Sequence, residues 1–167
     1  MVTCRTSTHD VGELLVVARS IAESLQIQRT LDDWQQAHFR RAVSTAYYAM
    51  FHALLQNNAD MLYGRETAQP KSPGRTAIYR ALTHTRARSK MAPRNMSSFP
   101  DAIADFAATF LDLQQQREDA NYNPNAIFTY SGAVNATNRA DNDISNFFDV
   151  TEEDLRALAV HLLFDSR

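Results

Sequence analysis

An arginine on the apolar side of a predicted helix is the residue of this chain best suited to bind an anion. Phe106 and Phe110 mark the side of that helix that faces the core, and Arg117 continues the same line. A guanidinium stays protonated at physiological pH, and burying it without a partner is very costly. Arg117 therefore extends to solvent at the helix end, pairs with a carboxylate such as Glu118 or Asp119, or binds an anion such as a phosphate in a cleft.

A stripe of polar and aromatic side chains on an earlier helix is a second candidate for binding. Arg41, Thr45, Tyr48 and His52 recur at i, i+4, i+7 and i+11. The opposite side is apolar and is predicted to face the core, with Phe39, Val43, Ala46, Met50, Ala53 and Leu54. The stripe predicts a contact surface that faces a partner subunit or a cleft. The alternative is a helix buried all round, whose polar atoms are hydrogen-bonded internally.

The segment 65–94 is strongly basic, although the formal net charge of the chain is −2. It holds eight Lys and Arg residues and one acidic residue, Glu66, which gives a local charge of +7. Such a segment is a candidate anion-binding patch, and the alternative is an ordinary solvated helix and loop. His84 lies within it and could approach a phosphate, whereas a plain surface histidine is the alternative.

Other kinds of site find no support in the residues. Cys4 is the single cysteine, which excludes an intrachain disulfide and a cysteine-based metal site. The other histidines are scattered without the i, i+4 pairing of a metal site. No glycine-rich phosphate loop and no serine nucleophile elbow occurs. We therefore expect no metal and no cofactor.

The elements that position these residues are predicted to be helices, because apolar residues repeat with a period of 3.6 and only four glycines occur. Asp10, Thr30, Ser98 and Thr151 are the candidate N-caps. The predicted helices span about 11–25, 31–59, 76–90, 98–121, 131–147 and 152 onward. The sequence predicts one all-α domain over 1–167, an up-and-down bundle of four long helices and one or two short ones.

The chain lacks the features of a secreted or membrane protein. Acidic residues interrupt the apolar positions of the first thirty residues, which argues against a signal peptide. No stretch approaches the roughly 18 consecutive apolar residues of a membrane span. We expect a cytoplasmic protein with no membrane partner.

Two segments resemble the HEPN family of helical bundles. Residues 41–52, Arg-Ala-Val-Ser-Thr-Ala-Tyr-Tyr-Ala-Met-Phe-His, resemble the alanine- and tyrosine-rich core helix of many prokaryotic HEPN proteins. Residues 113–124, Leu-Gln-Gln-Gln-Arg-Glu-Asp-Ala-Asn-Tyr-Asn-Pro, resemble their downstream signature Arg-x-x-Ala-Asp-Tyr-x-Pro. The segments occur in the family's order, and the helix pattern matches over most of the chain.

The resemblance implies a homodimer with a cleft between its subunits. In catalytic members an Arg-x4–6-His motif cleaves RNA without a metal, with a base for the 2′-hydroxyl and a cation for the phosphorane. Here Arg117 matches, but Tyr122 stands where histidine is expected, and a tyrosine with a pKa near 10 is a poor base. The motif Arg-x4-His is therefore degenerate, with Arg117 and Tyr122 as its catalytic candidates.

Three functions follow as hypotheses. The preferred one is a dimeric HEPN-type module, weakly catalytic or non-catalytic, that binds RNA, a nucleotide or a protein partner around Arg117. Its candidate binding residues are Arg117, Asp119, Asn121, Tyr122, Arg41, Tyr48, His52 and His84. The resemblance also implies a nucleotidyltransferase-type partner, as in some toxin–antitoxin pairs. The alternatives are an endoribonuclease toxin and a purely structural interaction domain.

Overall fold

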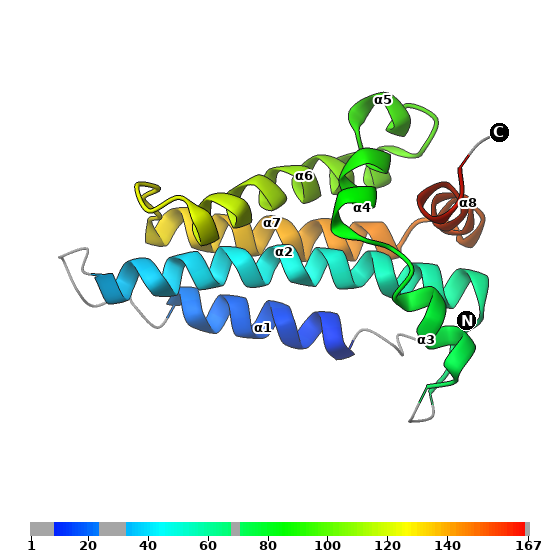
Figure 1. Cartoon of the computed structure of the whole chain (residues 1–167), viewed down its shortest axis with the longest axis horizontal. Helices are drawn as coiled ribbons and strands as arrows, with labels where there is room; N and C mark the ends of the chain where they lie inside the picture. The colour runs from blue at the N-terminus through cyan, green and yellow to red at the C-terminus, as the bar shows by residue number, and fades with distance from the viewer. Residues whose placement is uncertain (1–8, 24–32, 68–70, 166–167) are drawn as a thin grey trace.

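Four long helices form an up-and-down bundle in the computed structural model of the chain, which describes residues 9–23, 33–67 and 71–165. They are α1 (His9–Glu23), α2 (Asp33–Leu62), α6 (Asp101–Tyr122) and α7 (Tyr130–Phe148), and each runs antiparallel to the one before it (Figure 1). The described residues contain no strand, so the predicted all-α class is confirmed. Within them no helix is long and apolar enough to cross a membrane.

Helix α2 is the centre of the bundle and packs against α1, α6 and α7. The side of α2 that the sequence predicts to face the core is confirmed as buried. Its six residues are each at most 3% exposed: Phe39, Val43, Ala46, Met50, Ala53 and Leu54. Ala42, Ala49 and Ala59 of the same helix are also fully buried, and small side chains of this kind let the neighbouring helices approach closely. The helix is buried on nearly all sides along its second half, which is why it shows little amphipathic character.

The described residues also form four shorter helices, where the sequence predicted one or two, and these lie toward one end of the bundle (Figure 1). They are α3 (Pro73–Tyr79), α4 (His84–Lys90), α5 (Pro93–Met96) and α8 (Glu152–Leu163). The prediction of one helix over 76–90 is wrong, because the chain breaks between α3 and α4. Thr83 has extended backbone there, and its hydroxyl accepts from the Arg86 N–H to cap α4. Buried Leu82 fixes this turn against the core.

The predicted caps have different outcomes. Thr151 is confirmed, because its hydroxyl accepts from the Asp154 N–H at 3.2 Å. The prediction that Ser98 is the N-cap of α6 is wrong, since this helix begins at Asp101 and Pro100 occupies the cap position with no side-chain bond. Asp10 is wrong too, because α1 already begins at His9 and an N-cap requires a non-helical backbone. Thr30 lies outside the described residues.

A buried ion pair attaches α3 to α2. The Arg75 guanidinium donates to the Asp60 carboxylate, and their side chains are only 6% and 8% exposed. The Arg75 Nε is also buried and has no partner. Gly74 lies against the ring of Tyr63, where an added Cβ would be 2.5 Å from a ring carbon. A hydrogen bond between the His52 ring of α2 and the Tyr79 hydroxyl adds a second polar contact between the two helices.

Arg40 organises the C-terminal end of α6 and the loop that follows. Its guanidinium donates to the carbonyls of Ala120 at 2.9 Å and Asn123 at 3.0 Å, and also to that of Ala126. Because the last carbonyls of a helix lack partners and carry partial negative charge, a cation is favourable at this position. Gln36 adds a reciprocal pair of bonds to the backbone of Phe128. These contacts fix the backbone just beyond Arg117.

Candidate functional site

Arg117 lies against two tyrosines of α2. Its Nη2 donates to the Tyr48 hydroxyl at 2.9 Å, and its guanidinium carbon is 5.5 Å and 5.9 Å from the ring centroids of Tyr48 and Tyr47. The bond to Tyr48 raises the pKa of Arg117 above its ordinary value. The Arg117 Nε is buried and has no hydrogen-bond partner. The guanidinium is thus oriented by the Tyr48 hydroxyl and by two aromatic rings.

No carboxylate of the described part of the chain lies within 4.0 Å of the Arg117 guanidinium nitrogens. Glu118, one of the two expected partners, bonds instead to Arg88 on α4 at 3.1 Å. Asp119, the other, has no ion pair with Arg117 and offers its backbone carbonyl to Arg40. Within the described chain, Arg117 therefore contacts only the Tyr48 hydroxyl and the faces of two aromatic rings, and no counter-charge. Such a cation is suited to bind an external anion.

His84 is brought to Arg117 by the fold and not by sequence spacing. The first residue of α4, it stacks on Phe51 at 3.9 Å and has its Nδ1 2.7 Å from the Tyr47 hydroxyl. Burial lowers the pKa of His84, and the charge of Arg117 lowers it further. His84 is consequently neutral at neutral pH.

We infer that the Tyr47 hydroxyl donates the hydrogen bond that it shares with the Nδ1 of His84. Burial raises the pKa of Tyr47, so its hydroxyl stays protonated and needs an acceptor. The Nδ1 of His84 is the acceptor that the structure provides, which leaves the ring proton on Nε2. The one lone pair of neutral His84 that can accept a hydrogen bond is therefore occupied by the Tyr47 hydroxyl. In this arrangement it can donate a hydrogen bond but is not poised to act as a general base.

The stripe predicted on α2 is mostly covered by the chain itself. Arg41 is exposed, whereas Thr45 is buried and donates to the Arg41 carbonyl at 2.8 Å. Tyr48 is half-buried under Arg117, and the His52 ring is hydrogen-bonded to the Tyr79 hydroxyl of α3. Internal bonding, the alternative to an open contact surface, thus describes most of the stripe. Only the part around Arg41 faces outward.

Tyr122 and Asn121 are exposed at the end of α6. Tyr122, 76% exposed, ends the helix about 140° around its axis from Arg117, since five residues rotate by 5 × 100°. No hydrogen bond joins the two side chains, but Tyr122 is near enough to contribute to the raised pKa of Arg117. The degenerate motif therefore places an exposed aromatic ring at the end of the helix, on a different side from Arg117, and no base.

The basic segment 65–94 is mostly neutralised by the rest of the chain. Arg86 and Lys90 of α4 donate to carbonyls at the C-terminal end of α8 and pair with Asp165. Arg75 pairs with Asp60, and Arg88 pairs with Glu118. Most of these charges are thus bonded to other parts of the described chain, which matches neither an open anion-binding patch nor a freely solvated helix and loop.

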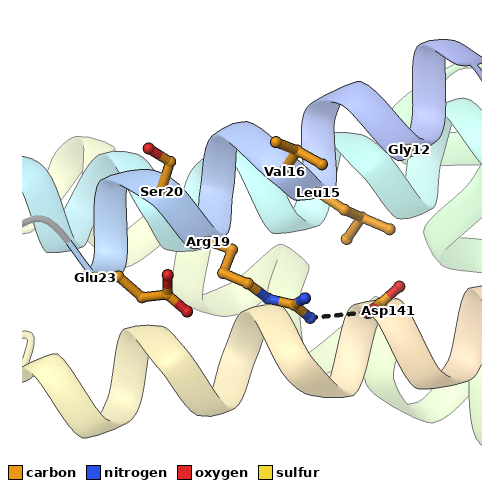
Figure 2. A pocket seen from close by; sticks show the side chains of 7 residues that line it. All are labelled: Gly12, Leu15, Val16, Arg19, Ser20, Glu23 and Asp141. Carbon is orange, nitrogen blue, oxygen red and sulfur yellow. Dashed lines mark hydrogen bonds and ion pairs between the residues drawn. The ribbon is translucent and has the colours of Figure 1, made fainter.

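A groove of about 650 Å³ lies between α1 and α7 (Figure 2). Its lining comes mainly from α1, with apolar Leu15 and Val16 beside charged Arg19 and Glu23. Arg19 bonds to Asp141 at 2.8 Å and to Asn138, so its charge is balanced within the chain. The described residues contain no cluster of His, Cys, Asp or Glu suited to a metal ion. Arg117 remains the stronger candidate.

The chain matches no protein-family model, no curated protein and no solved structure. The case for a function therefore depends on the geometry around Arg117. Two contributors to that geometry, Tyr47 and Arg88, were not singled out by sequence reasoning. Tyr47 falls among the buried residues of α2, and the contact of Arg88 with α6 depends on how α4 packs.

Proposed function

We propose that the chain is a HEPN-type module that binds the phosphates of single-stranded RNA at Arg117. The observation that carries the proposal is the Arg117 guanidinium, which is oriented by Tyr48 and has no carboxylate partner in the described chain. Phosphate oxygens match the donors of a guanidinium fork and add charge to the hydrogen bonds. The resemblance of segments 41–52 and 113–124 to HEPN proteins supports the same ligand class.

Single-stranded RNA is favoured over a free nucleotide by the exposed aromatic ring near the cation. Tyr122 projects from the end of α6 with 76% of its surface exposed. Bases of an unpaired strand stack on such rings while a cation holds the backbone. Arg40 bonds to the backbone of Ala120 and Asn123, on either side of Tyr122, so the ring starts from a defined position. Nucleotide or protein binding at Arg117 would be alternative outcomes of the test.

Weak or absent RNA cleavage is part of the proposal. Attack by a 2′-hydroxyl needs a group that accepts its proton. The phenol of a tyrosine such as Tyr122 is a poor proton acceptor at neutral pH. The lone pair of the His84 Nδ1 already accepts the hydrogen bond from Tyr47. Brisk cleavage by the purified wild-type protein would favour the endoribonuclease alternative.

The test is a titration of the full chain with a short labelled single-stranded RNA. Replacing Arg117 with glutamine keeps a polar side chain over the tyrosines but removes the charge. The expected cost is about 1.5–3 kcal/mol of binding free energy, the contribution of a charge-assisted hydrogen bond. Arg19→Gln on α1 is the matched control, since it removes the same charge far from Arg117 and is expected to change affinity little.

Two results would count against this proposal. If Arg117→Gln and Arg19→Gln lower the affinity for RNA equally, only the overall charge of the chain matters for binding. If wild type binds no RNA and Arg117→Gln simply lowers the melting temperature, Arg117 is structural. Arg117→Lys separates these effects further, because it restores the charge without the planar fork.

We also propose that the chain is a homodimer. Trp34, Arg41 and Tyr48 recur every seven residues along one side of α2, and Trp34 is 54% exposed while Arg41 is exposed as well. A two-fold axis near this row would bring the two Arg117 sites together. Light scattering at micromolar concentration should give twice the 18.9 kDa chain mass. A monomer mass that persists at higher concentration would refute the dimer.

A nucleotidyltransferase encoded beside this chain is the protein partner to test by co-purification, and its failure to co-purify would count against that pairing.

A further inference from the structure

Arg88 is the one basic residue of α4 that the structure pairs with α6. Arg86 and Lys90 of the same helix donate to carbonyls at the end of α8. Arg88 instead donates to both carboxylate oxygens of Glu118, at 3.1 Å and 3.3 Å. Glu118 is the residue after Arg117, so this ion pair lies at the edge of the candidate site.

Arg88 and His84 lie on the same side of α4, since they are four residues apart. His84 contacts Tyr47, and Tyr47 lies beneath Arg117. Helix α4 therefore reaches the surroundings of Arg117 at two points, through His84 against Tyr47 and through Arg88 bonded to Glu118.

The ion pair that occupies Arg88 is an exposed one. The side chains of Arg88 and Glu118 are 50% and 37% exposed, whereas those of the buried pair Arg75 and Asp60 are 6% and 8% exposed. Exposed ion pairs are weak, because water screens the charges and both side chains lose freedom. A ligand with a stronger or more concentrated negative charge can compete with Glu118 for Arg88.

We propose that Arg88 is a second phosphate-binding residue of the Arg117 site, and that Glu118 occupies it until an RNA strand with adjacent phosphates displaces the carboxylate. This inference rests on the proposed binding of RNA at Arg117. Glu118 then acts as an internal competitor that lowers affinity for ligands that reach Arg117 alone. A strand that offers a second phosphate gains the Arg88 contact and overcomes the competition.

The test is a double-mutant cycle on the full chain, with a short labelled single-stranded oligouridylate as the probe. Glu118→Gln frees Arg88 and should raise affinity about two- to fivefold, the range that the strength of an exposed ion pair implies. Arg88→Gln should lower affinity and reduce the slope of log affinity against log salt by about 0.7 in magnitude, the loss of one phosphate contact on a single strand. In the Arg88→Gln background, Glu118→Gln should have no further effect.

Asp112→Asn is the matched control. Asp112 is also on α6, is 44% exposed and pairs with Arg139 at 2.6 Å. This variant makes the same change of charge, and it should leave affinity nearly unchanged. A rise equal to that of Glu118→Gln would overturn the inference, because removal of any acidic charge would then suffice.

Two other results would also overturn it. One is a rise in affinity from Glu118→Gln that persists in the Arg88→Gln background, and the other is an unchanged salt slope in Arg88→Gln. Arg117→Gln, measured in the same titrations, separates the proposed function of Arg117 from the inference about Arg88. If it weakens binding while Arg88→Gln does not, only the inference about Arg88 fails. If it leaves binding intact, the proposed function fails as well.

Discussion

Replacing Asp60 with alanine is expected to lower the free energy of unfolding by about 3–5 kcal/mol, because it leaves a buried guanidinium without its counter-charge. Arg75 is 5% exposed and its Nε already lacks a partner, so the variant would leave the buried cation still less satisfied. The local consequence is release of α3 from α2. Chemical denaturation followed by far-ultraviolet circular dichroism measures the loss.

The matched control is Asp112→Ala, which breaks an exposed pair with Arg139 and is expected to cost about 0–1 kcal/mol. The double variant Asp60→Leu with Arg75→Met should recover much of the loss, since removing both charges removes the uncompensated cation. Comparable losses for Asp60→Ala and Asp112→Ala would contradict the structure's placement of the Asp60 pair in the interior.

Replacing Arg40 with alanine is expected to cost about 2–4 kcal/mol of unfolding free energy, since hydrogen bonds from a charged donor to the backbone are strong and several are lost together. The carbonyls of Ala120 and Asn123 would lose their donor at the end of α6. The cation over the ring of Phe128, 5.3 Å from its centroid, would be lost as well. Amide hydrogen exchange should accelerate over residues 123–128.

Arg41→Ala, measured below the concentration at which the proposed dimer forms, is the matched control for Arg40→Ala, because the neighbouring arginine is exposed and has no hydrogen bond to the loop from its side chain. Its expected effect on stability is within about 0.5 kcal/mol. Arg40→Lys should fall between the two, since an ammonium keeps the charge near the helix end but cannot reach as many carbonyls. Equal stability of the Arg40→Ala and Arg41→Ala proteins would show that the loop is held by something else.

The long helices could be predicted from sequence because their periodicity is local. The apolar line through Phe39, Val43 and Met50 predicts the buried side of α2, and each of these residues is at most 3% exposed. Thr151 is a correct cap for the same reason, since its bond reaches only three residues ahead. The break between α3 and α4 was missed because Thr83 competes with continued helical periodicity, and the packing of Leu82 decides between them.

The candidate site was predictable only in part. Helical periodicity places Arg117 on the inner side of α6, but its partner Tyr48 is 69 residues away in sequence. His84 was identified by its basic surroundings, whereas its contact with Tyr47 depends on how α4 packs across the bundle. The charge count of the segment 65–94 was misleading for a similar reason. A count of charges does not show that Arg86 and Lys90 face the C-terminal end of α8.

The most direct test of the central claim is to follow the arginine Nε–Hε signals in the nuclear magnetic resonance spectrum as a short single-stranded RNA is added. The Arg117 signal is assigned by its absence in Arg117→Lys, and the Arg40 signal serves as the internal reference because its donors are bonded to the loop. The account predicts that the Arg117 signal shifts saturably with RNA and that added salt reverses the shift. RNA that binds without moving the Arg117 signal, while other arginine signals shift, would contradict it.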